Sequence, residues 1–140
     1  MIHEVTVRVT FADTDATGII YYGRYFTYFE QGFLGFLRSM DIGYQELTAQ
    51  GIRLPVVEAQ CRYLAPSRVE NVLLIRTRLI HVGSASLKFG YEIHNQNQEN
   101  RLVAKGFTRH AVLGKIWKPK PWPASIKSIL LSELKPEKFS

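Results

Sequence analysis

Cysteine is almost absent from this chain of 140 residues, since Cys61 is the only one. One thiol excludes a disulfide framework and any zinc site that needs several cysteines. The few histidines lack the spacing of metal ligands, and no His-x-x-x-His occurs. The chain also has no Gly-x-Ser-x-Gly, P-loop or Gly-x-Gly-x-x-Gly. We therefore expect no metal and no bound cofactor, and a Ser-His-Asp hydrolase is disfavoured.

Long hydrophobic runs are missing too, because no stretch approaches the ~20 apolar residues of a membrane-spanning helix. The start, Met1-Ile2-His3-Glu4, lacks the basic and apolar segments of a secretory signal. Hydrophobic residues make up 46% and charged residues 21%, which is ordinary for one globular domain. The sequence thus predicts a cytoplasmic protein that does not insert into a membrane.

Acidic side chains are scarce near the C-terminus. Residues 101–140 contain nine basic side chains against Glu133 and Glu137, a net charge of +7, whereas residues 1–100 have a net charge of −1. A basic end is typical of segments that bind nucleic acid, a membrane surface or the phosphates of a small ligand, and equally of a solvated tail. The segment Lys115–Lys120 mixes cations with Trp117, but one short run is too little to predict nucleic acid as a partner.

The predicted elements follow the order of one strand, one long helix and four strands. Residues 5–11 alternate strictly, which predicts a half-buried strand with Val5, Val7, Val9 and Phe11 on one face. From Tyr25 the apolar spacing changes to three and four, which is typical of a helix. The helical stripe is Phe26, Phe29, Phe33, Phe36, Leu37 and Met40, and strands are predicted over 52–64, 72–82, 86–94 and 101–113, with a short helix over 125–134.

Two glycines, Gly32 and Gly35, interrupt the apolar stripe of the long helix. Each costs about 1 kcal/mol of helix propensity relative to alanine, so we expect the helix to press closely on a sheet there. One helix cannot cover both faces of five strands, and the strands have apolar residues on more than one face. A second copy of the chain is the simplest cover for the remainder.

A polar loop over residues 12–18 leads directly into the start of the long helix, and it contains Asp13, Asp15 and Gly18. A helix N-terminus presents free N–H groups that can hold an oxyanion, and a nearby carboxylate can act as nucleophile or general base. Glycine would let the backbone approach a ligand closely. The alternative is that both aspartates only cap the loop and helix, which is their commoner role at this spacing.

Residues 13–25 follow the pattern Asp-x-Asp-x-x-Gly-Ile-Ile-Tyr-Tyr-x-x-Tyr, which resembles the signature of the 4-hydroxybenzoyl-CoA thioesterase family. This family includes the acyl-CoA thioesterases associated with the Tol-Pal system. The likeness continues at Tyr28-Phe29-Glu30, Gly51-Ile52 and Pro55-Val56-Val57, and covers about residues 4–113. It implies an α+β hotdog fold, in which a five-stranded antiparallel sheet wraps around one long central helix. Dimers that join their sheets edge to edge, and homotetramers of two dimers, are implied as well.

The resemblance also implies roles for individual residues. Asp15 corresponds to the catalytic aspartate, Asp13 to a supporting residue, and the backbone amide of Tyr22 to the group that polarises the thioester carbonyl. Gly18 and Tyr25 fall at substrate-binding positions of the signature. Glu30 matches an acidic position that lines the acyl pocket from the neighbouring subunit, or else it is a solvated surface acid.

The sequence departs from the family at two places. Gly23 stands where Tol-Pal-type members often have a histidine, so a mechanism that uses that imidazole is excluded. The segment Gly83-Ser84-Ala85 stands where the hydroxybenzoyl-type enzyme has basic residues. Other cations must then bind the CoA phosphates, and the candidates are Lys88, Arg62, Arg68 and the segment Lys115–Lys120.

We therefore predict a single hotdog domain over residues 1–140, with a core at about 4–113 and a basic, proline-containing extension over 114–140. The expected activity is hydrolysis of an acyl-CoA thioester to a free acid and CoA. One alternative is a hotdog hydratase or dehydratase, which would need a histidine beside Asp15 in space. The other is a binding module for acyl-CoA or acyl carrier protein without turnover. The sequence leaves open whether the acyl group is aromatic, aliphatic or polyketide-like.

Overall fold

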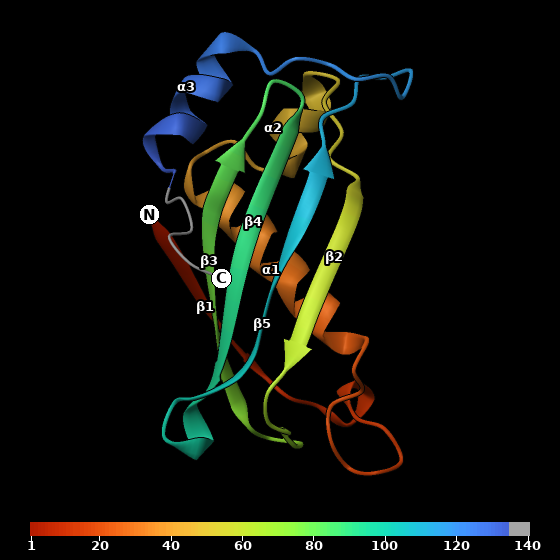
Figure 1. The fold of residues 1–140 in the computed structure, drawn as a ribbon, viewed down its shortest axis with the longest axis vertical. Helices are drawn as coiled ribbons and strands as arrows, with labels where there is room; N and C mark the ends of the chain where they lie inside the picture. The colour runs from red at the N-terminus through yellow and green to blue at the C-terminus, as the bar shows by residue number, and fades with distance from the viewer. Residues whose placement is uncertain (135–140) are drawn as a thin grey trace.

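A computed structural model describes residues 1–134, and residues 135–140 of the predicted extension lie outside that part. A five-stranded antiparallel sheet curves around one long helix (Figure 1), which confirms the predicted fold class. The strand order is β1-β3-β4-β5-β2, so β1 and β2 form the two edges. The elements are β1 (Ile2–Arg8), α1 (Arg24–Ser39), α2 (Tyr44–Ala49), β2 (Val56–Tyr63), β3 (Val72–Val82), β4 (Ser86–Asn95), β5 (Arg101–Ala111) and α3 (Ala124–Ser132), with 3-10 turns at Phe11–Asp13 and Gln96–Gln98.

The helix α1 lies against the inner face of the sheet, as the apolar stripe predicts. Phe29 stacks on Tyr91 of β4 with ring centroids 4.3 Å apart, and Phe36 packs edge-on against Phe89. The two glycines mark the closest approach: a methyl group on Gly32 would overlap Thr77 of β3, and one on Gly35 would lie 2.5 Å from the His3 ring. The close packing expected from these glycines is confirmed.

The strands follow the predicted alternation, but the bounds of two of them differ: β2 begins at Val56 and not at residue 52. Leu73, Ile75, Thr77 and Leu79 of β3 are buried against the helix, and β4 buries its alternate residues in the same way. The first strand, however, covers residues 2–8 and not 5–11. Phe11 was expected on its buried face but is 82% exposed, because the strand ends at Arg8 and residues 11–13 form a 3-10 turn.

The segment after β5 folds back over the end of the sheet. Residues 113–119 form a tight hairpin, closed by a bridge between Leu113 and Pro119. Trp122, Ile126 and Leu130 are then buried, so α3 adds to the core beside β3. Within residues 1–134 we find no helix that is both long enough and apolar enough to cross a membrane.

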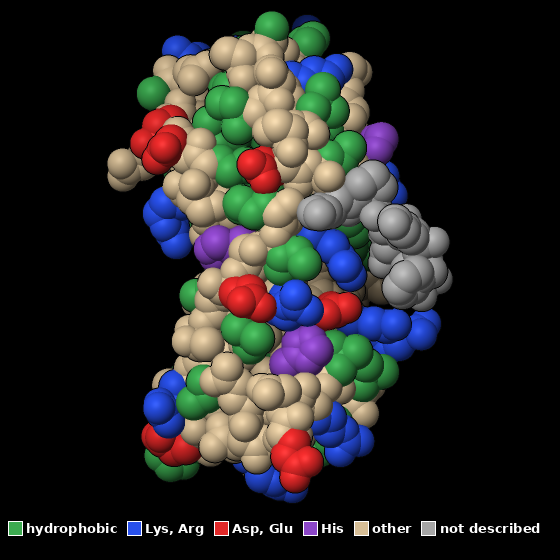
Figure 2. Space-filling model, turned by 90° about the vertical axis from the view of Figure 1, so that its left-hand side faces the viewer, with side chains coloured by type: hydrophobic (Ala, Val, Ile, Leu, Met, Phe, Trp, Pro, Cys, Tyr) green, Lys and Arg blue, Asp and Glu red, His purple; other side chains and the backbone are tan. Residues whose placement is uncertain are grey.

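The two edges of the sheet differ in character. The face that carries β1 and α3 shows side chains of both charges close together (Figure 2), and ion pairs such as Arg76–Glu4 (2.9 Å) lie there. Along β2, in contrast, every residue except the half-buried Cys61 is exposed, including Val56 (48%) and Tyr63 (45%). β2 also carries Arg62 and Glu58, which pairs with Arg109, and its exposed edge is a template for pairing with another chain.

Candidate active site

The site at the start of α1 is built on a short hairpin in the loop that precedes the helix. Thr14 bridges to Ile20, and the amide of Asp15 donates to the Ile19 carbonyl (2.9 Å). Gly18 closes the turn with φ +82°, a left-handed conformation that favours glycine. Asp15 therefore sits on a rigid turn whose position is set by hydrogen bonds of the backbone.

The Asp15 carboxylate is only partly held by its own loop. Its Oδ1 accepts hydrogen bonds from the hydroxyl and the backbone amide of Thr17. These two bonds, the hydroxyl first, hold the pKa of Asp15 below its usual range, so the group is ionised at neutral pH. Within residues 1–134, Oδ2 makes no hydrogen bond. An ionised carboxylate with one free oxygen is suited to attack a carbonyl or to take a proton from water.

Asp13, in contrast, is a structural residue. It is only 8% exposed, and it accepts hydrogen bonds from the Thr10 amide (2.8 Å) and from Arg24 Nε (2.6 Å). Burial alone would raise its pKa, but these bonds together lower the pKa below the usual value. Because Arg24 is the first residue of α1, the ion pair ties the loop to the helix. This geometry matches the supporting role expected for Asp13.

Free backbone donors lie where α1 begins. The amides of Tyr22 and Gly23 donate to no acceptor within residues 1–134, whereas those of Tyr21 and Arg24 are both paired. Unpaired N–H groups at a helix start can stabilise a negative oxygen. The carbonyl of Tyr22 accepts a hydrogen bond from the Tyr63 hydroxyl (2.9 Å), which fixes this peptide against the end of β2.

Tyr25 and Gly18 occupy different surroundings in the structure. The Tyr25 ring is 3% exposed and packs edge-on against Tyr63, 5.2 Å between centroids, and burial raises its pKa to about 12. Gly18 is exposed at the loop turn, and a side chain placed on it would lie 3.7 Å from Arg68 Nη1. Gly18 is thus open to a ligand, whereas within one chain Tyr25 is buried and packs against Tyr63.

Glu30 lies away from Asp15 in the same chain, on the second turn of α1. It borders an apolar hollow of about 310 Å³ between α1, α2 and the residues before β2. The walls of this hollow are Phe33, Leu34, Leu37, Tyr44, Leu47 and Leu54. Neither Asp15 nor Tyr22 of the same chain lines this hollow.

No histidine forms a hydrogen bond with Asp15 within residues 1–134. His94 lies by Glu92 and the Asn100 carbonyl, and His110 is buried between Thr108 and the Leu54 carbonyl. This part of the chain also gathers no group of three or more His, Cys, Asp or Glu side chains that could hold a metal ion.

Two residues near the site, Arg24 and Tyr63, were not predicted from the sequence. The position of Arg68 beside Gly18 was not predicted either. A signal existed for Arg24, because a cation in the first turn of a helix opposes the helix dipole and therefore requires a local anion. Tyr63 is 41 residues from its acceptor, the Tyr22 carbonyl, and no local sequence pattern predicts such a contact.

Comparisons with known proteins indicate the family of the chain. Residues 9–130 match the family described as "Thioesterase-like superfamily". The chain is 33% identical over 97 residues to "Acyl-CoA thioester hydrolase YbgC" of Escherichia coli O6:H1, which covers 69% of this chain and 71% of that protein. It is also 26% identical over 125 residues to the 1,4-dihydroxy-2-naphthoyl-CoA hydrolase of Synechocystis, with 85% of this chain and 90% of that protein covered.

Solved structures show the same fold. The crystal structure of a hypothetical protein from Thermus thermophilus superposes with a TM-score of 0.87 at 31% identity, covering 95% of this chain and 98% of that one. The likeness thus extends over nearly the whole chain.

Proposed function

The chain belongs to the thioesterase-like superfamily and is a thioester hydrolase, and on that premise we propose that it cleaves acyl-CoA at Asp15, beside the free amides of Tyr22 and Gly23. The products are a carboxylic acid and CoA. The observation that carries the assignment is an ionised carboxylate with a free oxygen, on a rigid turn that leads into a helix start with unpaired N–H donors.

In the proposed mechanism the thioester carbonyl oxygen accepts from the amides of Tyr22 and Gly23. These donors stabilise the oxyanion that forms when the carbonyl carbon is attacked, an effect worth about 10²–10³ in rate for one donor elsewhere. The Tyr63 hydroxyl holds the Tyr22 peptide in place through its carbonyl. Because the donors belong to the backbone, they need no reorganisation during the reaction.

Asp15 then acts by one of two routes. It either takes a proton from a water that attacks the carbonyl, or attacks the carbonyl itself and forms an anhydride that water opens. In both routes the C–S bond breaks and the thiolate leaves. A thiolate needs no strong acid to help it, since a thiol such as that of cysteine has a pKa near ~8.5. One carboxylate and oriented amides therefore suffice, and the mechanism needs no metal.

A second copy of the chain completes the site in this proposal. Two copies that pair antiparallel along β2 would cover the exposed edge and extend the sheet. Their two-fold axis would bring the apolar hollow beside Glu30 of one copy toward the catalytic loop of the other. The acyl group would then lie against Phe33, Leu34 and Leu54 of the partner. We propose at least a dimer, with a homotetramer of two dimers as its extension.

Two other functions remain as test outcomes. A hydratase or dehydratase would need a histidine at Asp15, and two of the four histidines, His94 and His110, have other hydrogen-bond partners. A binding module without turnover would bind acyl-CoA and show no loss on mutation of Asp15.

The test is thiol release from aliphatic and aromatic acyl-CoAs by wild type, Asp15→Asn and the control Asp41→Asn. Asp41 lies in an exposed turn with φ +60°, a conformation that asparagine tolerates. We expect the Asp15 variant to lose about a hundredfold or more in kcat and the Asp41 variant to keep wild-type activity. Equal turnover by wild type and the folded Asp15 variant would refute the assignment.

Oxygen-18 water separates the two routes in a single turnover. Label in Asp15 would indicate an anhydride that water opens at the enzyme carbonyl. Unlabelled Asp15 would leave general base catalysis, or water attack on the substrate carbon of the anhydride.

A further inference from the structure

We propose that the hairpin at residues 113–119 is the binding site for the nucleotide end of CoA, and that it serves the catalytic loop of the partner copy. This inference rests on the proposed function and on pairing along β2.

The hairpin displays an aromatic ring among cations. Trp117 is 63% exposed with φ +60°, a conformation that bulky residues seldom adopt. Its backbone amide donates a hydrogen bond to the Gly114 carbonyl (3.0 Å), which holds the turn. The Arg53 guanidinium lies 5.8 Å from the centre of its ring. The other tryptophan, Trp122, is 6% exposed and belongs to the core. The fold thus exposes one indole and keeps the other inside.

The charge of the hairpin is of one sign. Lys115 and Lys118 flank Trp117, and the sequence has no acidic residue from 100 to 132. Within residues 1–134 no carboxylate pairs with Arg53, Lys115 or Lys118, whereas most other arginines on the sheet are paired with glutamates. Lys120 differs, because its Nζ donates to the Gln50 carbonyl (3.0 Å). A group with two or more phosphates would neutralise this surface.

An aromatic ring beside free cations matches the chemistry of a nucleotide. Stacking of a base on an aromatic side chain is worth about 1–3 kcal/mol, and lysines bind phosphates as point charges. CoA ends in an adenine nucleotide that carries a 3′-phosphate and a pyrophosphate. The hairpin therefore offers a ring for the base and separate cations for the two phosphate positions.

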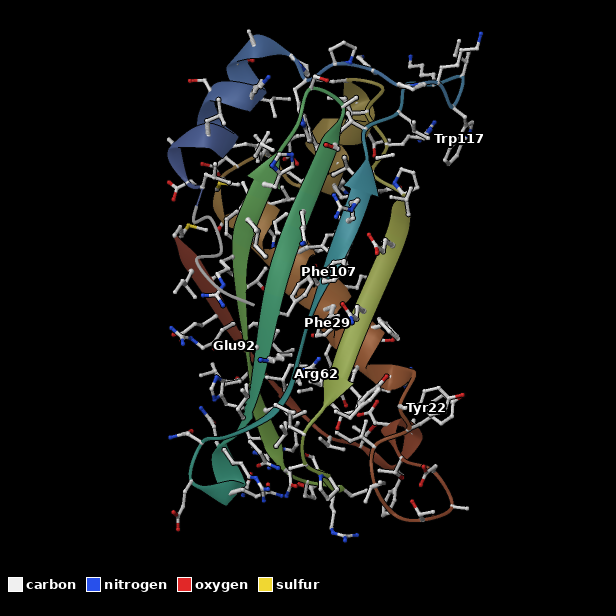
Figure 3. All side chains as sticks on the ribbon, in the orientation of Figure 1. Tyr22, Phe29, Arg62, Glu92, Phe107 and Trp117 are labelled. Atoms are coloured by element: carbon white, nitrogen blue, oxygen red, sulfur yellow. The ribbon has the colours of Figure 1, made fainter. Side chains whose placement is uncertain are left out.

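The position of the hairpin explains why it would bind the nucleotide of the substrate that reacts at the partner's Asp15. Within one chain Trp117 and Tyr22 lie at opposite ends of β2 (Figure 3). Arg53 bridges to Leu113 just before β2, and Tyr63 at the far end holds Tyr22. The strand between them has eight residues, roughly 26 Å at the usual rise. One chain thus separates the two places by the length of a strand.

A two-fold axis through the middle of β2 removes this separation. Antiparallel pairing sets Val56 of one copy beside Tyr63 of the other, which brings the hairpin of each copy next to the catalytic loop of its partner. The apolar hollow beside Glu30 lies at the same end of α1 as Leu54 and approaches that loop as well. Acyl group and nucleotide would then both contact the copy that does not supply Asp15.

The first test compares acyl-CoA with the same acyl group on pantetheine, which lacks the nucleotide. Lys115→Glu/Lys118→Glu should raise KM for acyl-CoA about tenfold, leave kcat unchanged, and leave the kinetics on acyl-pantetheine unaltered. The matched control is Lys105→Glu/Lys127→Glu, which makes the same change of charge on β5 and α3. Equal KM changes in the two double variants would overturn the proposal, since a general charge effect would then explain them.

Complementation tests whether the hairpin acts on the partner. Coexpression of Asp15→Asn with Lys115→Glu/Lys118→Glu gives hybrid dimers with one intact Asp15 facing one intact hairpin. Such hybrids should recover low-KM hydrolysis of acyl-CoA that neither parent has. If the hairpin served its own chain, no hybrid would contain a complete site, and the absence of recovery would refute the assignment.

Fluorescence gives a readout apart from activity. CoA should quench the exposed Trp117 in wild type and in Trp122→Phe, but not in Trp117→Phe. A response of Trp117 to anionic lipid vesicles without any response to CoA would overturn the proposal in favour of a membrane contact. Turnover of acyl-pantetheine that depends on Asp15, together with no effect of the hairpin variants, would reject this site and keep the thioesterase.

Discussion

Replacing Gly32 by alanine should destabilise the protein, against the expectation from helix propensity. Gly32 lies in the interior of α1, where alanine would by itself add about 1 kcal/mol of stability. The added methyl group, however, would lie 3.2 Å from Tyr91 Cε1 and 3.3 Å from Ile75 Cγ2, and it would overlap Thr77 Oγ1. All three belong to neighbouring strands that pair with each other, so none can move freely.

Overpacking of a core typically costs about 1–3 kcal/mol. With three close contacts the upper part of that range applies, and subtraction of the propensity gain leaves a net loss of about 1–2 kcal/mol. For a chain of this size we expect Tm to fall by roughly 3–8 °C. The start of α1 would shift with the helix, so kcat should fall as well.

A second variant turns this expectation into a test of mechanism. Thr77 Oγ1 is buried without a hydrogen-bond partner in the structure, so Thr77→Ala opens space at little polar cost. Gly32→Ala should therefore be less harmful, or even stabilising, in the Thr77→Ala background, with a favourable coupling of about 1 kcal/mol or more. Differential scanning calorimetry measures all four proteins, with the exposed Gln31→Ala as control. A higher Tm for Gly32→Ala alone would refute the packing argument.

Two further predictions concern the edge of the sheet and a buried histidine. Val57→Asp together with Ala59→Asp should lower the molar mass measured by sedimentation and reduce kcat, because these exposed residues lie on the β2 edge. The control is Ile2→Asp with Thr6→Asp, which adds the same charges to β1. An unchanged molar mass of the β2 variant would contradict pairing along β2. Burial lowers the pKa of His110, so the unfolded chain takes up a proton near pH 6.5 before the folded protein does. The free energy of unfolding, measured with urea, should fall by up to about 1.4 kcal/mol per pH unit as the pH is lowered from 7.5 to 5.5. If a His110→Gln variant showed the same dependence on pH, another group would be responsible.

The sequence by itself determined the elements and the loop that carries Asp13 and Asp15. Alternation over 72–82 and 86–94 specified which side chains face the helix, because successive residues of a strand point to opposite faces. The spacing of phenylalanines from Phe26 to Phe36 specified the helix for a similar reason. The residues from Asp13 to Tyr25 are close in the chain, so their shared loop was predictable from local pattern alone.

The tertiary structure decided what depends on contacts between distant residues. It separated the roles of the two aspartates, since Asp13 is buried beside Arg24 while Asp15 keeps an oxygen free. It also moved Phe11 from the predicted core to the surface, because β1 ends at Arg8. Most of all, it set Trp117 and Tyr22 at opposite ends of β2, a relation that arises from strand pairing and that no spacing along the chain contains.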